Sequence, residues 1–292
     1  MKPVILLFVI NPISGTARRS WQQLITEYFR EKQVQLIFLL LDRETSASDI
    51  KISIHENQPD RVIAVGGDGT IKLVATALLD YSIPMGIIPA GSANGLAHEL
   101  GIPGNPIEAM DIIESGNIIR IHAIAINHEI CLHLADIGLN ARAIKKFNRG
   151  KIRGWLGYGW ASLHALYTAQ LHRISIQTEN ETLKLRAAMI VLANGTSYST
   201  VQVINPSGSL TDKHFEVVVM KEISFIETLK MLFTHHPFNP EKVEIFSTQE
   251  ISIHCKKRIP FQIDGEYCGK VKNIQARVIE NAIAVMVPKT ST

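Results

Sequence analysis

A chain of 292 residues with 46% hydrophobic and 20% charged residues is long enough to bury one large core or two ordinary ones, and this composition excludes a disordered chain. The net charge of +3 is compatible with a mild preference for anionic membrane surfaces, but it lies far from the basic excess of nucleic-acid-binding proteins. The cysteines are widely spaced and form no CxxC pair, so neither a zinc site nor a disulfide framework is indicated: Cys131, Cys255 and Cys268.

The amino terminus carries an apolar run at residues 4–10. The run is too short to span a membrane, and Asn11-Pro12 stands where a signal peptide would have a small-residue cleavage site. We therefore interpret it as a buried first strand and expect a cytoplasmic protein.

The first third of the chain alternates strand-like and helix-like segments. The expected strands are 4–10, 34–41, 61–65 and 85–88, and the first helix-like segments lie around 20–32 and 46–56. This rhythm is typical of a doubly wound α/β sheet. We assign residues 1–120 to an α/β domain.

After residue 120 the pattern changes to closely spaced β-like runs, which predict a second, mainly β domain built as a β-sandwich. Helices are expected to interrupt it near 155–169 and 224–233. This domain covers residues 121–292, and its last residues could return to the first domain. The expected strands are 121–126, 130–134, 174–177, 183–191, 215–220, 243–245, 251–255, 261–263 and 282–287.

The sharpest motif follows the strand at 61–65 and reads Gly66-Gly67-Asp68-Gly69-Thr70. Glycines let backbone N–H groups approach phosphate oxygens, and the following helix favours anions at its amino-terminal end. Asp68 can reach a bound magnesium ion or its waters. The alternative is a tight strand-to-helix turn that uses glycine for positive φ. The motif is neither a Walker A loop nor a GxGxxG fingerprint.

Two further loops follow strands of the same predicted sheet. Asn11-Pro12-Ile13-Ser14-Gly15 follows the first strand, and residues 86–94 read GIIPAGSAN. Because ligands bind at the carboxyl ends of parallel strands, we expect the three loops to form one cleft.

Together these strings, NPxSG, GGDGT and GxxPxGSAN, resemble those of the diacylglycerol kinase catalytic-domain family, which includes soluble bacterial lipid kinases and the sphingosine kinases. The resemblance continues through the second domain and covers nearly the whole chain. Residues 136–141 are similar to the family's GIGFDA, Asn194-Gly195 is similar to its NG turn, and Asp264-Gly265-Glu266 is similar to its DGE motif.

The resemblance implies an α/β nucleotide domain and a β-sandwich with ATP in the cleft between them. By resemblance, ATP would be contacted by Asn11, Gly66, Gly67, Asp68, Gly69, Thr70 and Ser92. Asp264 and Glu266 would approach the acceptor hydroxyl, with Glu266 as the general base and Mg²⁺ offsetting phosphate charge. Taken alone, Asp264-Gly265-Glu266 is better explained as a hairpin turn.

The function implied is an ATP-dependent lipid kinase, peripheral at a membrane surface, with diacylglycerol as the default acceptor. Three family carboxylates are replaced here by Leu73, Gly95 and His122. These losses leave open a lipid- or nucleotide-binding pseudokinase. NAD kinase, a related fold that also carries GGDGT, is less favoured because NPISG and the late DGE fit lipid kinases better.

Two other segments have alternatives that stay open. The family's DDGLLDV loop can hold a structural cation, and the corresponding segment here predicts a site at Asp212 with backbone oxygens of Ser209 and His214, although Lys213 adds a competing charge. Residues 145–155 combine five cations with aromatic residues, a composition suited to an anionic bilayer or to a solvated loop.

Overall fold

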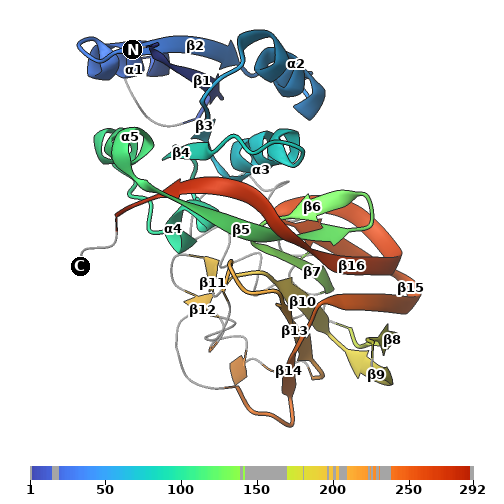
Figure 1. The fold of residues 1–292 in the computed structure, drawn as a ribbon. Coiled ribbons are helices and arrows are strands. Elements are labelled where there is room, and N and C mark those ends of the chain that lie inside the picture. Colours follow the sequence, from blue (N-terminus) through green and yellow to red (C-terminus); the bar gives the residue numbers. More distant parts are fainter. Residues whose placement is uncertain are drawn as a thin grey trace. The chain divides into compact units, whose positions relative to one another are not determined.

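The structure is a computed structural model, and its chain divides into two compact units (Figure 1). Unit 1 comprises Met1–Ile121 and Asn281–Thr292, and unit 2 comprises His122–Glu280. Gly15, the basic segment 145–155, the predicted helix at 155–169 and most of that at 224–233 lie outside the described residues. The structure describes residues 2–14, 20–138, 141, 170–179, 181–195, 197–199, 202–203, 209–222, 224, 226–227, 230 and 238–289.

Unit 1 is built on a parallel sheet with the strand order β16-β4-β3-β1-β2. The strands β1, β3 and β4 are buried over almost their whole length, because a parallel sheet is covered on both faces. This explains their nearly continuous apolar sequences. The strands are β1 (Val4–Ile10), β2 (Val34–Leu40), β3 (Arg61–Gly66), β4 (Met85–Pro89) and the end of β16 (Glu266–Val287).

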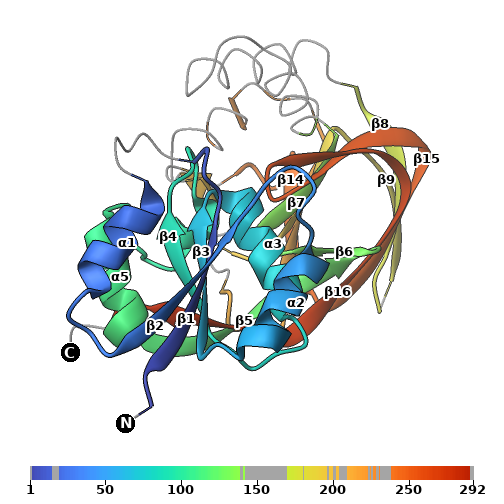
Figure 2. The ribbon, with the colours of Figure 1, turned by 90° about the horizontal axis from the view of Figure 1, so that it is seen from above.

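Helices cover both faces of this sheet, with α1 and α5 on one side and α2 and α3 on the other (Figure 2). Ser20 and Asn105 begin α1 and α5 by accepting backbone N–H groups, and Pro106 occupies the first turn of α5. The doubly wound α/β prediction is confirmed, although α4 and α5 were not predicted. The helices are α1 (Trp21–Phe29), α2 (Ala47–Asn57), α3 (Asp68–Leu78), α4 (Gly95–Glu99) and α5 (Pro106–Ser115).

Unit 2 is a β-sandwich-like domain of antiparallel strands, as predicted. One apolar core collects residues from strands far apart in sequence, among them Ile176, Phe215 and Ile253. The strands are β5 (Asn117–Ile126), β6 (Glu129–Cys131), β7 (Leu134–Gly138), β8 (His172–Gln177), β9 (Thr182–Ala187), β10 (Met189–Ala193), β11 (Ser197–Ser199), β12 (Gln202–Val203), β13 (Phe215–Met220), β14 (Val243–Thr248), β15 (Glu250–Ile263) and β16.

Strand β15 changes partners along its length. Residues 252–255 pair with β8, residues 261–263 pair with β7, and the register against β16 shifts between His254 and Ile259. The two strands predicted at 251–255 and 261–263 are therefore one strand with an irregularity in its middle. Conversely, the predicted strand 183–191 is divided at Ala188 into β9 and β10.

The predicted strand 130–134 is also divided, into the end of β6 and the beginning of β7. The backbone N–H groups of Leu132 and His133 bond to the side chain of Asp264 instead of a neighbouring strand. The predicted strand is thus interrupted by hydrogen bonds to Asp264, a residue distant in sequence. The local sequence pattern could not reveal this interruption. Throughout the part of the chain that the structure describes, no helix is long and apolar enough to cross a membrane.

Candidate functional site

In unit 1, three loops leave neighbouring parallel strands at the same edge of the sheet. The Asn11 N–H donates to the Val65 carbonyl at 2.9 Å, and the Ala90 N–H donates to the Gly66 carbonyl at 2.8 Å. These bonds hold the ends of β1 and β4 against the end of β3. The motifs beginning at Asn11 and Gly66 and the loop after Pro89 therefore meet, as their predicted positions required.

Backbone contact between two of these loops requires glycine. A Cβ atom on Gly91 would lie 2.5 Å from the Gly67 Cα, and one on Gly66 would lie 2.3 Å from the Thr70 Oγ1. None of the three glycines has a positive φ. Close approach, rather than the positive φ considered from sequence, is the reason for glycine here.

Helix α3 begins immediately at this contact. Its N-cap is Gly67, which supplies no side-chain oxygen, and its first residue is the half-buried Asp68. Gly69 is exposed, whereas Thr70 lies buried inside the first turn. The amino-terminal N–H groups of a helix attract anions, so this end suits a phosphate group approached by backbone alone.

The loop that carries Ser92 is closed by Asn94. The Gly91 N–H donates to Asn94 Oδ1 at 2.8 Å, and Asn94 Nδ2 donates to the Gly91 carbonyl at 2.9 Å. Asn94 adopts a left-handed φ of 50°, which asparagine tolerates better than most residues. Ser92 is thereby held at an exposed loop tip. Asn94 was absent from the predicted site, although its place in the GSAN string was a signal for it.

Asn11 stabilises its own loop in a similar way. Its side-chain Oδ1 accepts the Ile13 N–H at 3.2 Å, and its backbone is bonded to Val65. The side chain is therefore engaged locally, as is common for asparagine at the end of a strand.

In unit 2, Asp264 and Gly265 form the tight turn between β15 and β16, and Glu266 is the first residue of β16. Asp264 and Gly265 both have left-handed φ values, 49° and 82°. The Asp264 carboxylate accepts the backbone N–H groups of Leu132 at 3.1 Å, His133 at 3.0 Å and Leu134 at 3.2 Å. Such charge-assisted bonds anchor the turn strongly to the segment between β6 and β7.

A buried polar chain supports the turn from its other side. Gln262 is fully buried, and its Oε1 accepts the Gly265 N–H at 2.8 Å while its Nε2 donates to Asp136. The Asp136 carboxylate also accepts the Ala141 N–H at 2.9 Å. Glu266, the next residue after the doubly anchored turn, is exposed. Sequence reasoning missed Gln262 because only the fold aligns it with Asp136.

Two family models together match most of the chain. Residues 5–126 match the diacylglycerol kinase catalytic domain, and residues 134–287 match the YegS C-terminal NAD kinase beta sandwich-like domain. The chain belongs to the diacylglycerol kinase family, among its YegS-like lipid kinases.

Individual relatives agree with this family. A protein named "Probable lipid kinase YegS" from Escherichia coli O1:K1 is 30% identical over 235 residues, covering 78% of each chain. A "Probable lipid kinase YegS-like" from Chromohalobacter salexigens is 25% identical over 241 residues, covering 79% of this chain and 77% of the relative.

Solved structures support the fold. A putative diacylglycerol kinase from Bacillus anthracis str. Sterne has a TM-score of 0.81 and 20% identity, with 100% of both chains covered. A second one from the same organism has a TM-score of 0.78 and 19% identity, covering 97% of each chain.

The family resemblance implies acidic residues at three positions that here hold Leu73, Gly95 and His122. The surroundings of these three residues differ. Leu73 is half-buried on α3, and Gly95 is buried as the first residue of α4. His122 is 3% exposed, and its Nε2 lies 3.1 Å from the Thr211 carbonyl. Since a carbonyl only accepts, this nitrogen carries a proton. His122 therefore donates a hydrogen bond at a position where the family resemblance implies a carboxylate.

The predicted cation loop is stabilised by hydrogen bonds of its own. Asp212 Oδ1 accepts the His214 N–H at 3.0 Å, and the Ser209 carbonyl accepts the Asp212 N–H at 3.4 Å. Within the described residues, no cluster of three His, Cys, Asp or Glu side chains could hold a metal. The predicted ligands at Ser209 and His214 are backbone oxygens and not side chains, so this site stays a prediction.

Lys213, the residue that replaces a glycine in this loop, has a partner. Its Nζ lies 2.9 Å from the Glu280 carboxylate. The hydrogen bond from Lys213, followed by its charge, lowers the pKa of Glu280. The pair partly offsets the positive charge that Lys213 brings to the loop.

Proposed function

We propose that this chain transfers the γ-phosphate of ATP to the hydroxyl group of a lipid, with diacylglycerol as the default acceptor. The observation that carries the proposal is the anchoring of the Asp264-Gly265-Glu266 turn by the Asp264 carboxylate. A turn fixed in this way holds the backbone of the next residue, Glu266, in one place, which supports the positioning that a general base requires. The choice of diacylglycerol among lipid alcohols rests on the family resemblance alone.

The glycine contact of unit 1 supports ATP as the phosphate donor. Side chains are excluded where Gly67 and Gly91 touch, and the first turn of α3 follows directly. Backbone N–H groups would bind the phosphates there, and Ser92 and Asn11 would contact the nucleotide from the adjoining loops.

Magnesium fits this arrangement as a companion of the nucleotide. Mg²⁺ is commonly bound by one or two carboxylates together with phosphate oxygens and water. Asp68, half-buried at the beginning of α3, would be the protein ligand. When bound, the ion would offset the charge that develops on the transferred phosphoryl group.

The two acidic residues of the turn receive different roles in this proposal. The oxygens of Asp264 already accept three backbone N–H groups, so Asp264 positions the turn. Glu266 is exposed and accepts the proton of the acceptor hydroxyl as that oxygen attacks the γ-phosphorus. The bond between the γ-phosphorus and the bridging oxygen breaks, and ADP leaves.

One observation favours a second candidate, a lipid- or nucleotide-binding pseudokinase. His122 presents a donor where the family has a carboxylate, and neither Leu73 nor Gly95 supplies one. Loss of three acids would weaken a magnesium-centred network around Asp68 and leave binding without turnover.

Transfer of labelled γ-phosphate from ATP and Mg²⁺ to a panel of lipid alcohols in detergent micelles tests the proposal. We expect a labelled lipid product with wild-type protein. Measurable ATP binding without any product would contradict the kinase and support the pseudokinase. A parallel reaction contains NAD and no lipid. Transfer of the label to NAD would contradict the lipid kinase proposal and support NAD kinase.

A further inference from the structure

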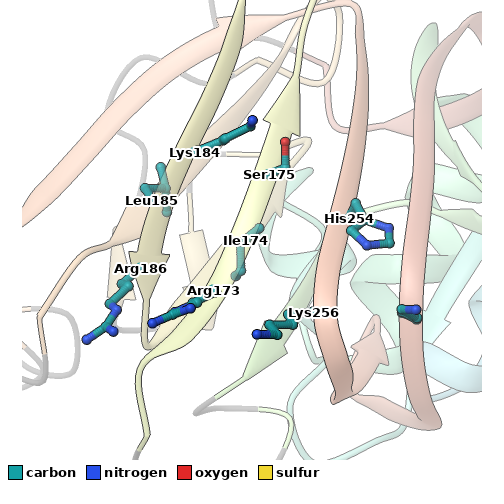
Figure 3. Close-up of a pocket in the computed structure, with 9 residues that line it drawn as sticks. Arg173, Ile174, Ser175, Lys184, Leu185, Arg186, His254 and Lys256 are labelled. Atoms are coloured by element: carbon teal, nitrogen blue, oxygen red, sulfur yellow. The ribbon is translucent and has the colours of Figure 1, made fainter.

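Unit 2 has an open hollow on the outer face of its β8–β9 hairpin, separate from the Asp264-Gly265-Glu266 turn. Its volume is about 710 Å³, and strands β8, β9, β15 and β16 contribute its walls. The charged and titratable side chains around it are all basic: Arg173, Lys184, Arg186, His254, Lys256 and Lys272. Figure 3 shows Arg186, Arg173 and Lys256 side by side on neighbouring strands.

The strand register forces like charges together in this hollow. Arg173 lies directly opposite Arg186 in the antiparallel pair of β8 and β9. Directly opposed like charges destabilise a sheet, so the arrangement has no structural benefit of its own. The neighbouring pair, Ile174 and Leu185, faces the apolar core, which leaves both arginines on the outer face.

Among the described residues, no acidic side chain lines the hollow. In the described part of the chain, none of its five Lys and Arg residues belongs to an ion pair. Elsewhere in unit 2, Lys221 pairs with Glu244 at 2.7 Å, and Lys242 lies 3.9 Å from Glu222. The acids nearest in sequence to the cations of β8 and β9 are Glu179 and Glu181, which lie at the turn end of the hairpin, away from the Arg173–Arg186 pair.

We propose that this hollow binds the phosphate groups of anionic phospholipids and so docks unit 2 on a charged bilayer. The five cations are exposed, and their long side chains come from four strands. An open, exposed array of this kind suits a surface that presents many headgroups better than one enclosed small ligand. The inference rests on the proposed function, because a lipid kinase must meet its acceptor at a membrane.

The test measures binding of the full chain, without ATP, to vesicles of phosphatidylcholine alone and with phosphatidylserine added. We expect binding that depends on phosphatidylserine and falls with salt. Arg173→Gln/Arg186→Gln should weaken it on the order of tenfold, because each cation near such a surface contributes to the attraction. Lys256→Gln/Lys272→Gln, on other strands, should weaken it similarly.

Lys221→Gln/Lys242→Gln is the matched control, since it removes the same charge from ion-paired lysines of the same unit. Its affinity should stay within about twofold of wild type. Equal vesicle binding by wild type and both hollow variants would overturn the proposal. So would a control variant that weakens binding as much as they do.

Two further measurements separate membrane docking from a structural role of the arginines and from a different anionic ligand. Thermal unfolding of Arg173→Gln/Arg186→Gln should occur at an unchanged or higher temperature, because the repulsion is relieved. A large fall would assign the arginines a structural role. Tighter binding to inorganic phosphate or duplex DNA than to anionic vesicles would replace the lipid surface by that ligand. The vesicle-binding test contains no ATP and measures no phosphate transfer. A failure to bind vesicles would therefore leave the result of the micelle assay, and with it the proposed function, unaffected.

Discussion

The two motif regions of this protein reach a fixed geometry by opposite means. In unit 1, the loops after β3 and β4 touch through Gly67 and Gly91, so their arrangement depends on side chains being absent. In unit 2, the turn after β15 depends on particular side chains being present, because Asp264 and Gln262 hold its backbone. In the proposed function, the first design would leave backbone groups for an anion, and the second would position a carboxylate that accepts a proton.

The largest expected effect comes from Glu266→Gln. Removing a general base lowers turnover by roughly 10²–10⁴-fold, while ground-state binding of ATP is retained. Lipid phosphorylation and ATP affinity should be measured on the same preparation. Glu241→Gln, an exposed acid elsewhere in unit 2, is the control and should retain wild-type turnover. Full turnover by Glu266→Gln would remove the residue from its proposed role.

Gly91→Ala should act on ATP binding instead. The added Cβ would lie 2.5 Å from the Gly67 Cα, so one loop must move. Overpacking of this kind costs about 1–3 kcal/mol, and we expect ATP affinity to fall about tenfold. Gly104→Ala is the matched control, because a Cβ there has nothing within 4 Å. Unchanged ATP affinity in Gly91→Ala would contradict the phosphate-loop proposal.

Asp264→Asn should affect stability and turnover together. The amide cannot accept all three backbone N–H groups in the present geometry, and a lost bond to a charged group costs about 1.5–3 kcal/mol. Denaturant unfolding should show that loss, and turnover should fall while ATP affinity stays unchanged. A variant with wild-type stability and turnover would show that the anchor is dispensable.

The smallest effect is expected at the Lys213–Glu280 pair. Because the pKa of Glu280 is lowered in the folded state, its contribution to stability is present above the unfolded pKa and is lost as pH falls through the folded value. Glu280→Gln should therefore unfold at a slightly lower temperature than wild type at neutral pH. The difference in unfolding temperature between the variant and wild type should vanish in acid. A difference that grows in acid would contradict a lowered pKa of Glu280 in the folded state.

The sequence was most informative where local pattern decides the structure. Buried parallel strands such as β1 and β3 have continuous apolar sequences, and GGDGT marked the beginning of α3 within two residues. Features made by distant segments could not be predicted in this way. The Gly67–Gly91 contact, the Gln262–Asp136 pair and the break between β6 and β7 each depend on tertiary neighbours.

The most direct test of the central claim measures ATP affinity and lipid phosphorylation for Gly91→Ala and Glu266→Gln side by side. The account predicts that Gly91→Ala weakens ATP binding, whereas Glu266→Gln binds ATP as wild type does and loses turnover. If Glu266→Gln phosphorylates lipid at the wild-type rate, or loses ATP affinity as strongly as Gly91→Ala does, the proposed division of roles between the two regions is wrong.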